Sequence, residues 1–297
     1  MTTIAIIGPG ALGGTVAAWL SQQEEHEVVV CARTGFANLM VETPAGLLTA
    51  RPEVITDPAL AMPVDWVLVT TKTYDAEATS TWLGRLVGDG TRVGVLQNGV
   101  EHVARFAPIL PGRAIVPAVV DIPASRSAPG RMQQHRFGSI VVPQGVDGDA
   151  FVALFAQTRI AVSAVPDWTS RAWAKLCHNC AGALTTLTQR STGPVWNNEI
   201  EALVRGLVSE CAAVGRAEGA DIPDSLIETV IEGARQAPEG SGNSMSADRL
   251  AGRPMELDAR NGVIGRLGRK HGIATPVNDL FVMLLTASGS PWIVQAT

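Results

Sequence analysis

Short apolar runs alternate with segments of helical spacing through the first half of the chain. The runs are rich in Val and Ile and are bounded by Gly, Pro, Asp or Asn, which is typical of strands; they cover residues 4–7, 28–31, 65–71, 92–96, 114–120 and 138–142. Helices are predicted between some of them, at residues 11–23, 76–87 and 150–157. This alternation predicts an α/β domain with a mostly parallel, doubly wound sheet.

The pattern changes near Pro166 and Asp167, where strand signals end and long helical runs begin. Helices are predicted at residues 169–189, 197–218, 225–234, 257–271 and 278–287, with a short helix starting at 246–248. Gly219 and Gly272 each follow a helical run and indicate its end. With 297 residues, 46% of them hydrophobic, the chain can bury two cores. We therefore expect two domains, 1–167 and 168–297.

Charge and hydropathy exclude several classes of protein. The net charge of −5 argues against an electrostatic nucleic-acid binder. No run reaches the roughly 18 apolar residues of a membrane span, and the first predicted strand begins too close to Met1 to leave room for a signal peptide. The acidic and histidine residues form no recognisable set of metal ligands. We expect a cytoplasmic protein that binds no metal, nucleic acid or membrane.

The four cysteines include a C-x-x-C pair, Cys177 and Cys180. Such a pair suggests zinc or redox chemistry, but no second pair completes a zinc site. The pair also lies inside an apolar helical run, not at a helix start that follows a strand. The sequence favours small thiols in the core.

The first predicted strand runs directly into Gly8-Pro9-Gly10-Ala11-Leu12-Gly13, a G-x-G-x-x-G pattern followed by a helix. Gly8 permits the tight turn, Gly10 lets a pyrophosphate approach the backbone, and Gly13 allows close packing of helix on strand. The helix N-terminus then offers N–H groups to the phosphates. Strand, glycines and helix in this order predict a dinucleotide site.

The end of the second predicted strand indicates which nicotinamide cofactor binds. NAD-specific folds place Asp or Glu there, roughly 20 residues past the glycines, on the ribose 2′-hydroxyl. Here the strand ends at Arg33, beside Thr34, with no acid. A guanidinium pairs well with a 2′-phosphate, so Arg33 favours NADP over NAD; the alternative is a solvated arginine.

Lys175 is isolated in the apolar helical run 169–189. It is the only charged residue between Arg171 and Arg190 when His178 is neutral, and Asn179, four residues on, shares its face. A partly desolvated lysine has a lowered pKa and can donate a proton near neutral pH. Reduction of a carbonyl needs such a donor, so Lys175 is a candidate general acid; the alternative is a lysine that snorkels to solvent.

Polar residues follow two further strands. Lys72 ends the run 65–71 and Asn98 follows the run 92–96, so both lie at carboxyl ends of predicted strands, where open α/β sheets bind ligands. Glu256 and Asp258 begin the predicted helix 257–271. They are either functional or simply favourable charges near a helix N-terminus.

Together these residues resemble the ketopantoate reductase (2-dehydropantoate 2-reductase) family over nearly the whole chain. Besides the glycine pattern, Arg33 and Lys72, the resemblance rests on four segments, namely Gln97-Asn98-Gly99, Trp173-Ala-Lys175-Leu-Cys-His-Asn179, Ser244-Met245-Ser-Ala-Asp248 and Arg253-Pro-Met-Glu256-Leu-Asp258-Ala-Arg-Asn-Gly262. It extends to Gly272-Ile-Ala-Thr-Pro276. The Ser-Met-x-x-Asp and Glu-x-Asp-x-x-x-Gly pieces are more specific than the glycine pattern.

The resemblance implies an NADPH-dependent oxidoreductase that makes pantoate for pantothenate and coenzyme A synthesis. Its Rossmann-like N-terminal domain would bind NADPH through the glycine loop, Arg33, Lys72 and Asn98. Its all-α C-terminal domain would resemble that of 6-phosphogluconate dehydrogenase. The family pattern makes Lys175 the general acid on the keto oxygen and Glu256 the acid that binds substrate hydroxyl and helps position the lysine. Asn98, Asn179 and Ser244 match substrate-contacting positions, with Ser244 near the carboxylate.

Two departures from the family pattern leave alternatives open. Ala183 stands where many members carry a second asparagine, and Met255 precedes Glu256 where threonine is common. A lost polar contact changes substrate preference more readily than it abolishes reduction. The first alternative is therefore a paralogous NADPH-dependent reductase of another 2-keto acid. A non-catalytic NADP(H) sensor would need neither Lys175 nor Glu256, and a β-hydroxyacid dehydrogenase would lack the Ser-Met-x-x-Asp signature. The amphipathic helices are compatible with a homodimer, and a monomer fits equally well.

Overall fold

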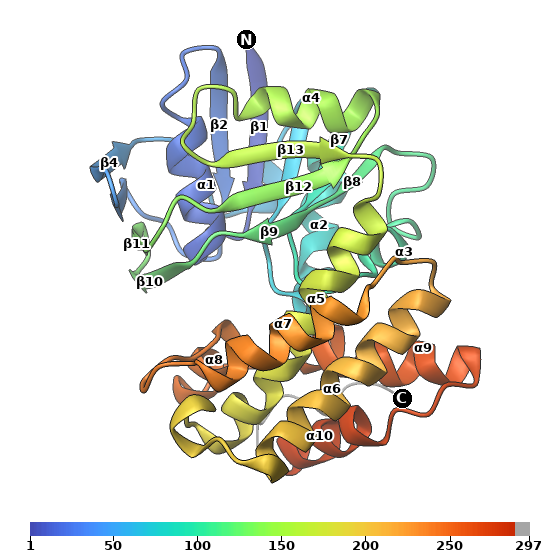
Figure 1. The fold of residues 1–297 in the computed structure, drawn as a ribbon. Coiled ribbons are helices and arrows are strands. Elements are labelled where there is room, and N and C mark those ends of the chain that lie inside the picture. The colour runs from blue at the N-terminus through green and yellow to red at the C-terminus, as the bar shows by residue number, and fades with distance from the viewer. Residues whose placement is uncertain (289–297) are drawn as a thin grey trace. The chain divides into compact units, whose positions relative to one another are not determined.

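The chain forms two compact units in the computed structural model, which describes residues 1–288. The first unit is Met1–Trp168 and the second begins at Thr169. The division lies one residue beyond the boundary that the sequence predicts. The first unit contains the sheets and the second is helical (Figure 1).

A six-stranded parallel sheet forms the centre of the first unit, in the order β5-β2-β1-β6-β7-β8. Its strands are β1 (Thr2–Ile7), β2 (His26–Cys31), β5 (Glu53–Ile55), β6 (Trp66–Val69), β7 (Arg92–Val95) and β8 (Ile115–Pro117). The chain adds strands on one side of β1 and then, from β6, on the other. The strand order therefore reverses between β1 and β6, which is the switch point where such sheets bind ligands. This confirms the predicted doubly wound sheet.

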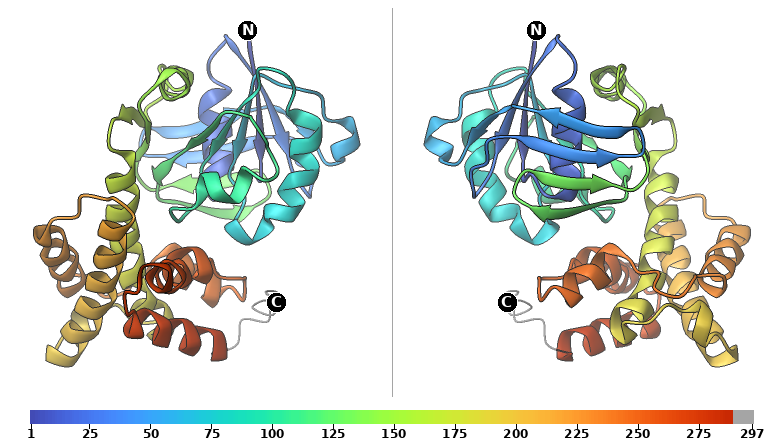
Figure 2. Two further views of the ribbon diagram at one scale, coloured as in Figure 1. Left: turned by 90° about the vertical axis from the view of Figure 1, so that its right-hand side faces the viewer. Right: turned by 90° about the vertical axis from the view of Figure 1, so that its left-hand side faces the viewer.

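Side chains that alternate along β1 build a core on each face of this sheet. Ile4 and Ile6 pack with α1 (Ala11–Leu20) and α4 (Val146–Leu154), whereas Ala5 and Ile7 pack with α2 (Ala76–Leu86) and α3 (His102–Phe106). Full burial of such an Ile side chain contributes about 1.5–3 kcal/mol. Figure 2 shows the helices on the two sides of the strands.

Two smaller sheets, which the sequence does not predict, complete the first unit. One has the order β10-β11-β3-β4, from Ala124–Ala128, Arg131–Gln134, Leu39–Thr43 and Gly46–Ala50; the other has the order β13-β12-β9, from Ala161–Val165, Ser139–Pro143 and Val119–Asp121. The first sheet packs on α1, where Trp19 Nε1 donates to Gln134 Oε1 at 2.9 Å and Met132 leaves no room for a side chain at Gly14. Helix α1 is thus enclosed between two sheets, and eight of its ten residues are buried.

The predicted single strand 114–120 is wrong, because the chain leaves the large sheet after Pro117. This proline has no N–H to donate to a ladder, and β8 ends there at the sheet edge. The chain resumes as β9 in the three-stranded sheet. The predicted helix 150–157 also begins too late, since α4 starts at Val146 after Gly145, whose φ is 140°.

The second unit consists of helices, as predicted. These are α5 (Trp168–Thr188), α6 (Asn198–Ala217), α7 (Asp224–Arg235), α8 (Ser244–Leu250), α9 (Val263–His271) and α10 (Pro276–Ala287), with the short 3₁₀ turn η3 (Gly193–Val195) between α5 and α6. The short turns η1 (Pro58–Leu60) and η2 (Thr73–Asp75) belong to the first unit. The predicted helix 257–271 begins with a π-helical turn, η4 (Asp258–Gly262), before α9. Gly219 and Gly272 follow α6 and α9 with positive φ, which confirms the predicted helix ends.

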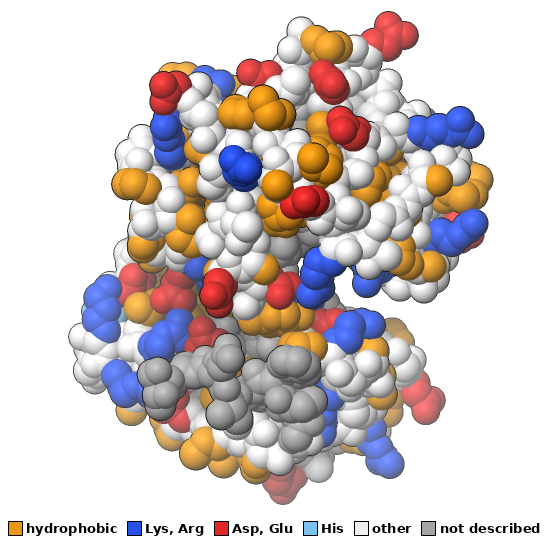
Figure 3. Space-filling model, turned by 180° about the vertical axis from the view of Figure 1, so that it is seen from behind, with side chains coloured by type: hydrophobic (Ala, Val, Ile, Leu, Met, Phe, Trp, Pro, Cys, Tyr) orange, Lys and Arg blue, Asp and Glu red, His pale blue; other side chains and the backbone are white. Residues whose placement is uncertain are grey.

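The four cysteines are free and buried, which confirms their interpretation as core thiols. Cys177 and Cys180 of α5 lie with Cys211 of α6, and burial together with hydrogen bonding to the other two thiols raises the pKa of Cys211. Within residues 1–288 no helix is long and apolar enough to cross a membrane. Lys, Arg, Asp and Glu side chains are interspersed on the face shown in Figure 3.

Candidate active site

The glycine loop lies directly after β1, beside the switch point of the sheet. Gly8 has φ of 87°, which favours glycine, and its N–H donates to Cys31 O at 3.1 Å. Thr70 Oγ1, at the end of β6, donates to Gly8 O at 2.8 Å. Pro9 and the N-cap Gly10 then lead into α1, whose first turn contains Ala11 and Leu12. The loop is therefore tied to the strands on both sides of β1.

The space around the glycines fits a dinucleotide. A Cβ on Gly13 would lie 2.2 Å from Thr70 Oγ1 and 2.5 Å from Gly8 O, so helix and strand pack too closely for any side chain there. At Gly10 the nearest atom to a Cβ would be 3.9 Å away. The second glycine thus leaves open space beside the free N–H groups of the first helical turn, as a pyrophosphate requires.

Arg33 lies two residues past the end of β2 and is exposed. In the part of the chain that the structure describes, no residue forms an ion pair with its guanidinium. Its charge is therefore available to a ligand at the carboxyl edge of the sheet, on the side of β1 where the ribose of a bound dinucleotide would lie. This arrangement fits a 2′-phosphate.

Lys72 and Asn98 follow β6 and β7 at the same edge, and both are half-buried. Gln97 holds the two strand ends together, because its Nε2 donates to Thr71 O at 3.0 Å and to Thr71 Oγ1 at 3.1 Å. The side-chain oxygen of Gln97 accepts from Arg105 Nη1 at 3.1 Å. Sequence reasoning gave Gln97 no role of its own, although a glutamine between a buried strand and Asn98 is a signal for one.

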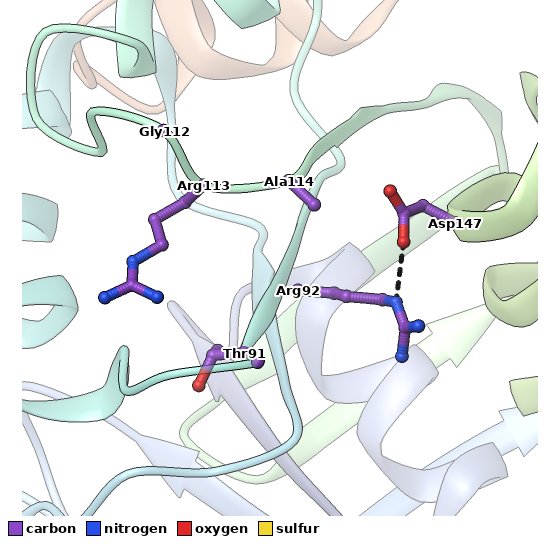
Figure 4. A pocket seen from close by; sticks show the side chains of 7 residues that line it. Thr91, Arg92, Gly112, Arg113, Ala114 and Asp147 are labelled. Carbon is purple, nitrogen blue, oxygen red and sulfur yellow. Dashed lines mark hydrogen bonds and ion pairs between the residues drawn. The ribbon is translucent and has the colours of Figure 1, made fainter.

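A hollow of about 260 Å³ lies at the opposite edge of the sheet (Figure 4). Its lining includes Thr91 and Ala114, which precede β7 and β8. Arg92 is paired with Asp147 at 2.7 Å, and Arg113 is paired with Asp89 at 3.0 Å. The hollow is at the amino ends of the strands and its arginines already have acidic partners, so it is not the dinucleotide site.

In the second unit, Lys175 and Asn179 lie one turn apart on α5 and are both half-buried. Trp173, Leu176 and Cys180 around them are buried. The predicted shared face therefore lies at the border between the core of the unit and its surface. A lysine in this position reaches solvent or a ligand with its ammonium while its stem packs on apolar side chains.

Ser244 is the exposed first residue of α8, and Asn243 fixes its place. Asn243 Oδ1 accepts from Met245 N at 2.9 Å and Ser246 N at 3.0 Å in a capping box. Asn243 Nδ2 donates to Gly182 O of α5 at 3.0 Å. The glycine-rich loop 238–243 thus ends in a residue that fastens Ser244 to the lysine helix.

Glu256 is 5% exposed and lies just before the π-helical turn, which contains Arg260, 4% exposed. Arg260 Nη1 donates to Ser244 Oγ at 3.3 Å. Burial lowers the pKa of Arg260, and the Glu256 carboxylate opposes that effect. The structure therefore gathers Ser244, Glu256 and Arg260. Sequence reasoning missed Arg260, although its position four residues after Glu256 in a helical run was a signal.

Asp258 and the two positions that depart from the family pattern have contacts that are explained by folding alone. Asp258 is exposed and pairs with Arg266. Ala183 is fully buried on α5, and Met255 is also buried. The two departures from the family pattern therefore fill space in the core of the helical unit.

Comparison with known proteins covers both units. A family model described as ketopantoate reductase PanE/ApbA matches residues 4–146, and the model of its C-terminal part matches residues 167–288. A 2-dehydropantoate 2-reductase of Caulobacter vibrioides is 58% identical over 97% of this chain and 99% of its own length. One of Mycobacterium tuberculosis is 38% identical over 97% of this chain and 98% of its own length.

Solved structures give the same picture. The PanE/ApbA family ketopantoate reductase of Ralstonia eutropha has a TM-score of 0.88 at 30% identity, covering 96% of this chain and 97% of that one. The 2-dehydropantoate 2-reductase of Geobacter metallireducens has a TM-score of 0.89 at 27% identity, covering 97% of this chain and 100% of that one. The fold of the whole described chain is thus the one these reductases share.

Proposed function

Because this chain belongs to the ketopantoate reductase PanE/ApbA family, we propose that it reduces 2-dehydropantoate to pantoate with NADPH. The observation that carries this proposal is the 58% identity, over nearly the full length of both chains, to a 2-dehydropantoate 2-reductase. The glycine loop at the switch point and the exposed Arg33 support it independently, since they suit a phosphorylated dinucleotide.

The first unit binds the cofactor. The loop from Gly8 to Gly13 holds the pyrophosphate, and Arg33 holds the 2′-phosphate. Lys72 and Asn98 lie at the carboxyl ends of the next two strands, on the nicotinamide side, and Gln97 ties these strand ends together through Thr71. NADPH bound by these residues would supply a hydride to the keto carbon of the substrate.

The second unit supplies the proton. As hydride reaches the keto carbon, negative charge grows on the keto oxygen. The Lys175 ammonium donates a hydrogen bond to that oxygen, stabilises the charge and transfers a proton from Nζ. Glu256 favours the charged form of the lysine and accepts a hydrogen bond from a substrate hydroxyl. Asn179 and Ser244 hold the substrate, Ser244 at its carboxylate.

The test is to mix the purified protein with NADPH and 2-dehydropantoate and follow the absorbance of the reduced nicotinamide. Rapid oxidation that is much slower with NADH supports cofactor, reaction and substrate together. Tight NADPH binding with slow oxidation refutes this substrate. A panel of 2-keto acids compared by kcat/KM then identifies the one that is reduced, with the surroundings of Ala183 as the first place to look. Failure with every acid would leave a non-catalytic NADP(H) sensor.

A further inference from the structure

Arg260 is a buried cation whose hydrogen bonds are incomplete. Its Nη1 donates to Ser244 Oγ at 3.3 Å and lies 3.5 Å from Asn243 Oδ1. Its Nε is buried and has no hydrogen-bond partner among residues 1–288. An arginine keeps its charge in proteins, and burying a charge with an unsatisfied hydrogen-bond donor costs free energy. A buried group of this kind in a native structure therefore needs an explanation, such as a role in function.

Two carboxylates lie close enough to Arg260 to act on its charge. Asp248 and Glu256 both act electrostatically on the guanidinium. Asp248 also pairs with Arg253 Nε at 2.9 Å, so its charge is shared with a second cation. Glu256 remains as the main counter-charge. The guanidinium itself is in hydrogen-bond contact with Ser244 Oγ, so its positive charge acts at short range on an anion bound to that hydroxyl.

The direction of the hydrogen bond between Arg260 and Ser244 is fixed by chemistry. A guanidinium only donates, so Ser244 Oγ must accept and its own proton remains to be donated. Within the described residues nothing accepts a hydrogen bond from that hydroxyl. Ser244 is exposed, whereas Arg260 is buried behind it. The pair thus presents an oriented, polarised O–H donor to the surface of the helical unit.

We propose that Arg260 is the positioning residue of the carboxylate subsite. It holds Ser244 as a hydrogen-bond donor, supplies the positive potential that an anionic group needs, and thereby makes the enzyme prefer 2-oxo acids to neutral 2-oxo compounds. This inference rests on the proposed reduction of a 2-oxo acid and adds the residue that sets the charge preference. Charge-assisted hydrogen bonds are stronger and more directional than neutral ones.

The experiment compares 2-dehydropantoate with its primary amide, which keeps the keto and hydroxyl groups but carries no charge. Arg260→Met is expected to lower kcat/KM for the acid about 10- to 100-fold, mainly through KM, and to change that for the amide less than about 3-fold. Ser244→Ala should give the same pattern. The double variant should lose more than Ser244→Ala but less than the product of the two single losses, because Arg260 acts partly through Ser244 and partly through its own charge. Arg260→Lys should restore part of the preference for the acid.

A matched control is Arg249→Met on α8, the helix that begins with Ser244. Arg249 Nη1 donates to Thr186 O and Leu187 O, both at 2.6 Å, and so ties α8 to α5 without contacting Ser244. This variant is expected to lower Tm and to leave the acid-to-amide ratio unchanged. NADPH affinity, which depends on the first unit, should be unchanged in every variant and reports that this unit is folded; far-UV circular dichroism and Tm report on the helical unit.

Several results would overturn the inference. Equal losses for acid and amide in Arg260→Met would assign Arg260 a purely structural role. If that variant does not fold, wild-type ratios in both Arg260→Lys and Ser244→Ala refute the proposal just as well. If the wild type reduces a different 2-oxo acid, the proposed substrate is wrong, and the ratio is measured with that acid and its amide. If it reduces none, both proposals are wrong.

Discussion

Gly10→Ala and Gly13→Ala are expected to affect different properties, although the two glycines are three residues apart in one loop. Gly13→Ala should lower stability, whereas Gly10→Ala should weaken NADPH binding. At Gly13 the new Cβ would lie 2.2 Å from Thr70 Oγ1 and 2.5 Å from Gly8 O. Overpacking of this kind costs about 1–3 kcal/mol. Displacing Thr70 adds about 1 kcal/mol for its hydrogen bonds to the loop, and the higher helix propensity of alanine offsets about 1 kcal/mol.

The net loss for Gly13→Ala is therefore about 1–3 kcal/mol, or a Tm lower by about 2–12 °C. At Gly10 the nearest protein atom would be 3.9 Å away, and φ of −71° suits alanine, so Tm should stay close to that of the wild type. The methyl group would instead occupy the space of the pyrophosphate. A similar clash of about 1–3 kcal/mol there weakens NADPH binding about 5- to 150-fold.

Thermal unfolding followed by circular dichroism and titration with NADPH followed by fluorescence measure the two effects. Each variant is the control for the other, since one should lose stability and the other should lose affinity. A Gly10→Ala protein that binds NADPH as the wild type does would show that no phosphate approaches this backbone. A Gly13→Ala protein with wild-type Tm would show that helix and strand are not packed as described.

Four further outcomes are expected. Arg33→Asp should weaken NADPH binding about 10- to 100-fold with little change for NADH; equal affinity for NADPH in variant and wild type would refute the 2′-phosphate role. Lys175→Ala should keep NADPH binding and lose about 100- to 10,000-fold in kcat, and unchanged turnover would exclude it as the acid. The four buried thiols should react with Ellman's reagent only after denaturation, since burial raises the pKa of Cys31 to about 12; rapid labelling of the native protein would contradict this. Hydrogen bonds from Lys270 and His271 lower the pKa of Glu218, so Glu218→Gln should lower Tm at neutral pH by about 1–3 °C. That difference should vanish as the pH falls below about 4.5 and through the lowered pKa, because the stabilising carboxylate is then protonated in both states; a difference that persists at acid pH would be inconsistent with it.

The parts of the fold that the sequence predicts are those with local signals. Buried strands, the glycine turn and helices that end at glycines each show a pattern within about ten residues. The sheet formed by β3, β4, β10 and β11 has no such signal, because Met40 pairs with Arg131, which is distant in the chain. Pro117 can end β8 because β8 is the edge strand of the large sheet, with β7 as its only neighbour in that sheet. The pairing of Met40 with Arg131 and the edge position of β8 both depend on tertiary structure.

The candidate site divides in the same way. Lys72 and Asn98 are visible in the sequence because they follow strands. Gln97, Asn243 and Arg260 act through contacts with residues from other elements, such as Thr71, Gly182 and Ser244. Gln97 and Arg260 are buried and Asn243 is half-buried, and contacts of this kind arise only once the helices and strands are packed.

Because α1 is enclosed between two sheets, its sequence is more constrained than that of the exposed end of β2. The helix behind the phosphate loop is buried on both sides, so its amide hydrogens should exchange with solvent only when the whole unit unfolds. Substitutions in α1 therefore lower the free energy of unfolding of the unit. Arg33, by contrast, is exposed and carries little of the packing. If Arg33 and the glycine loop have the roles we propose, a change at the end of β2 can alter the choice of dinucleotide while the glycine loop and α1 stay the same.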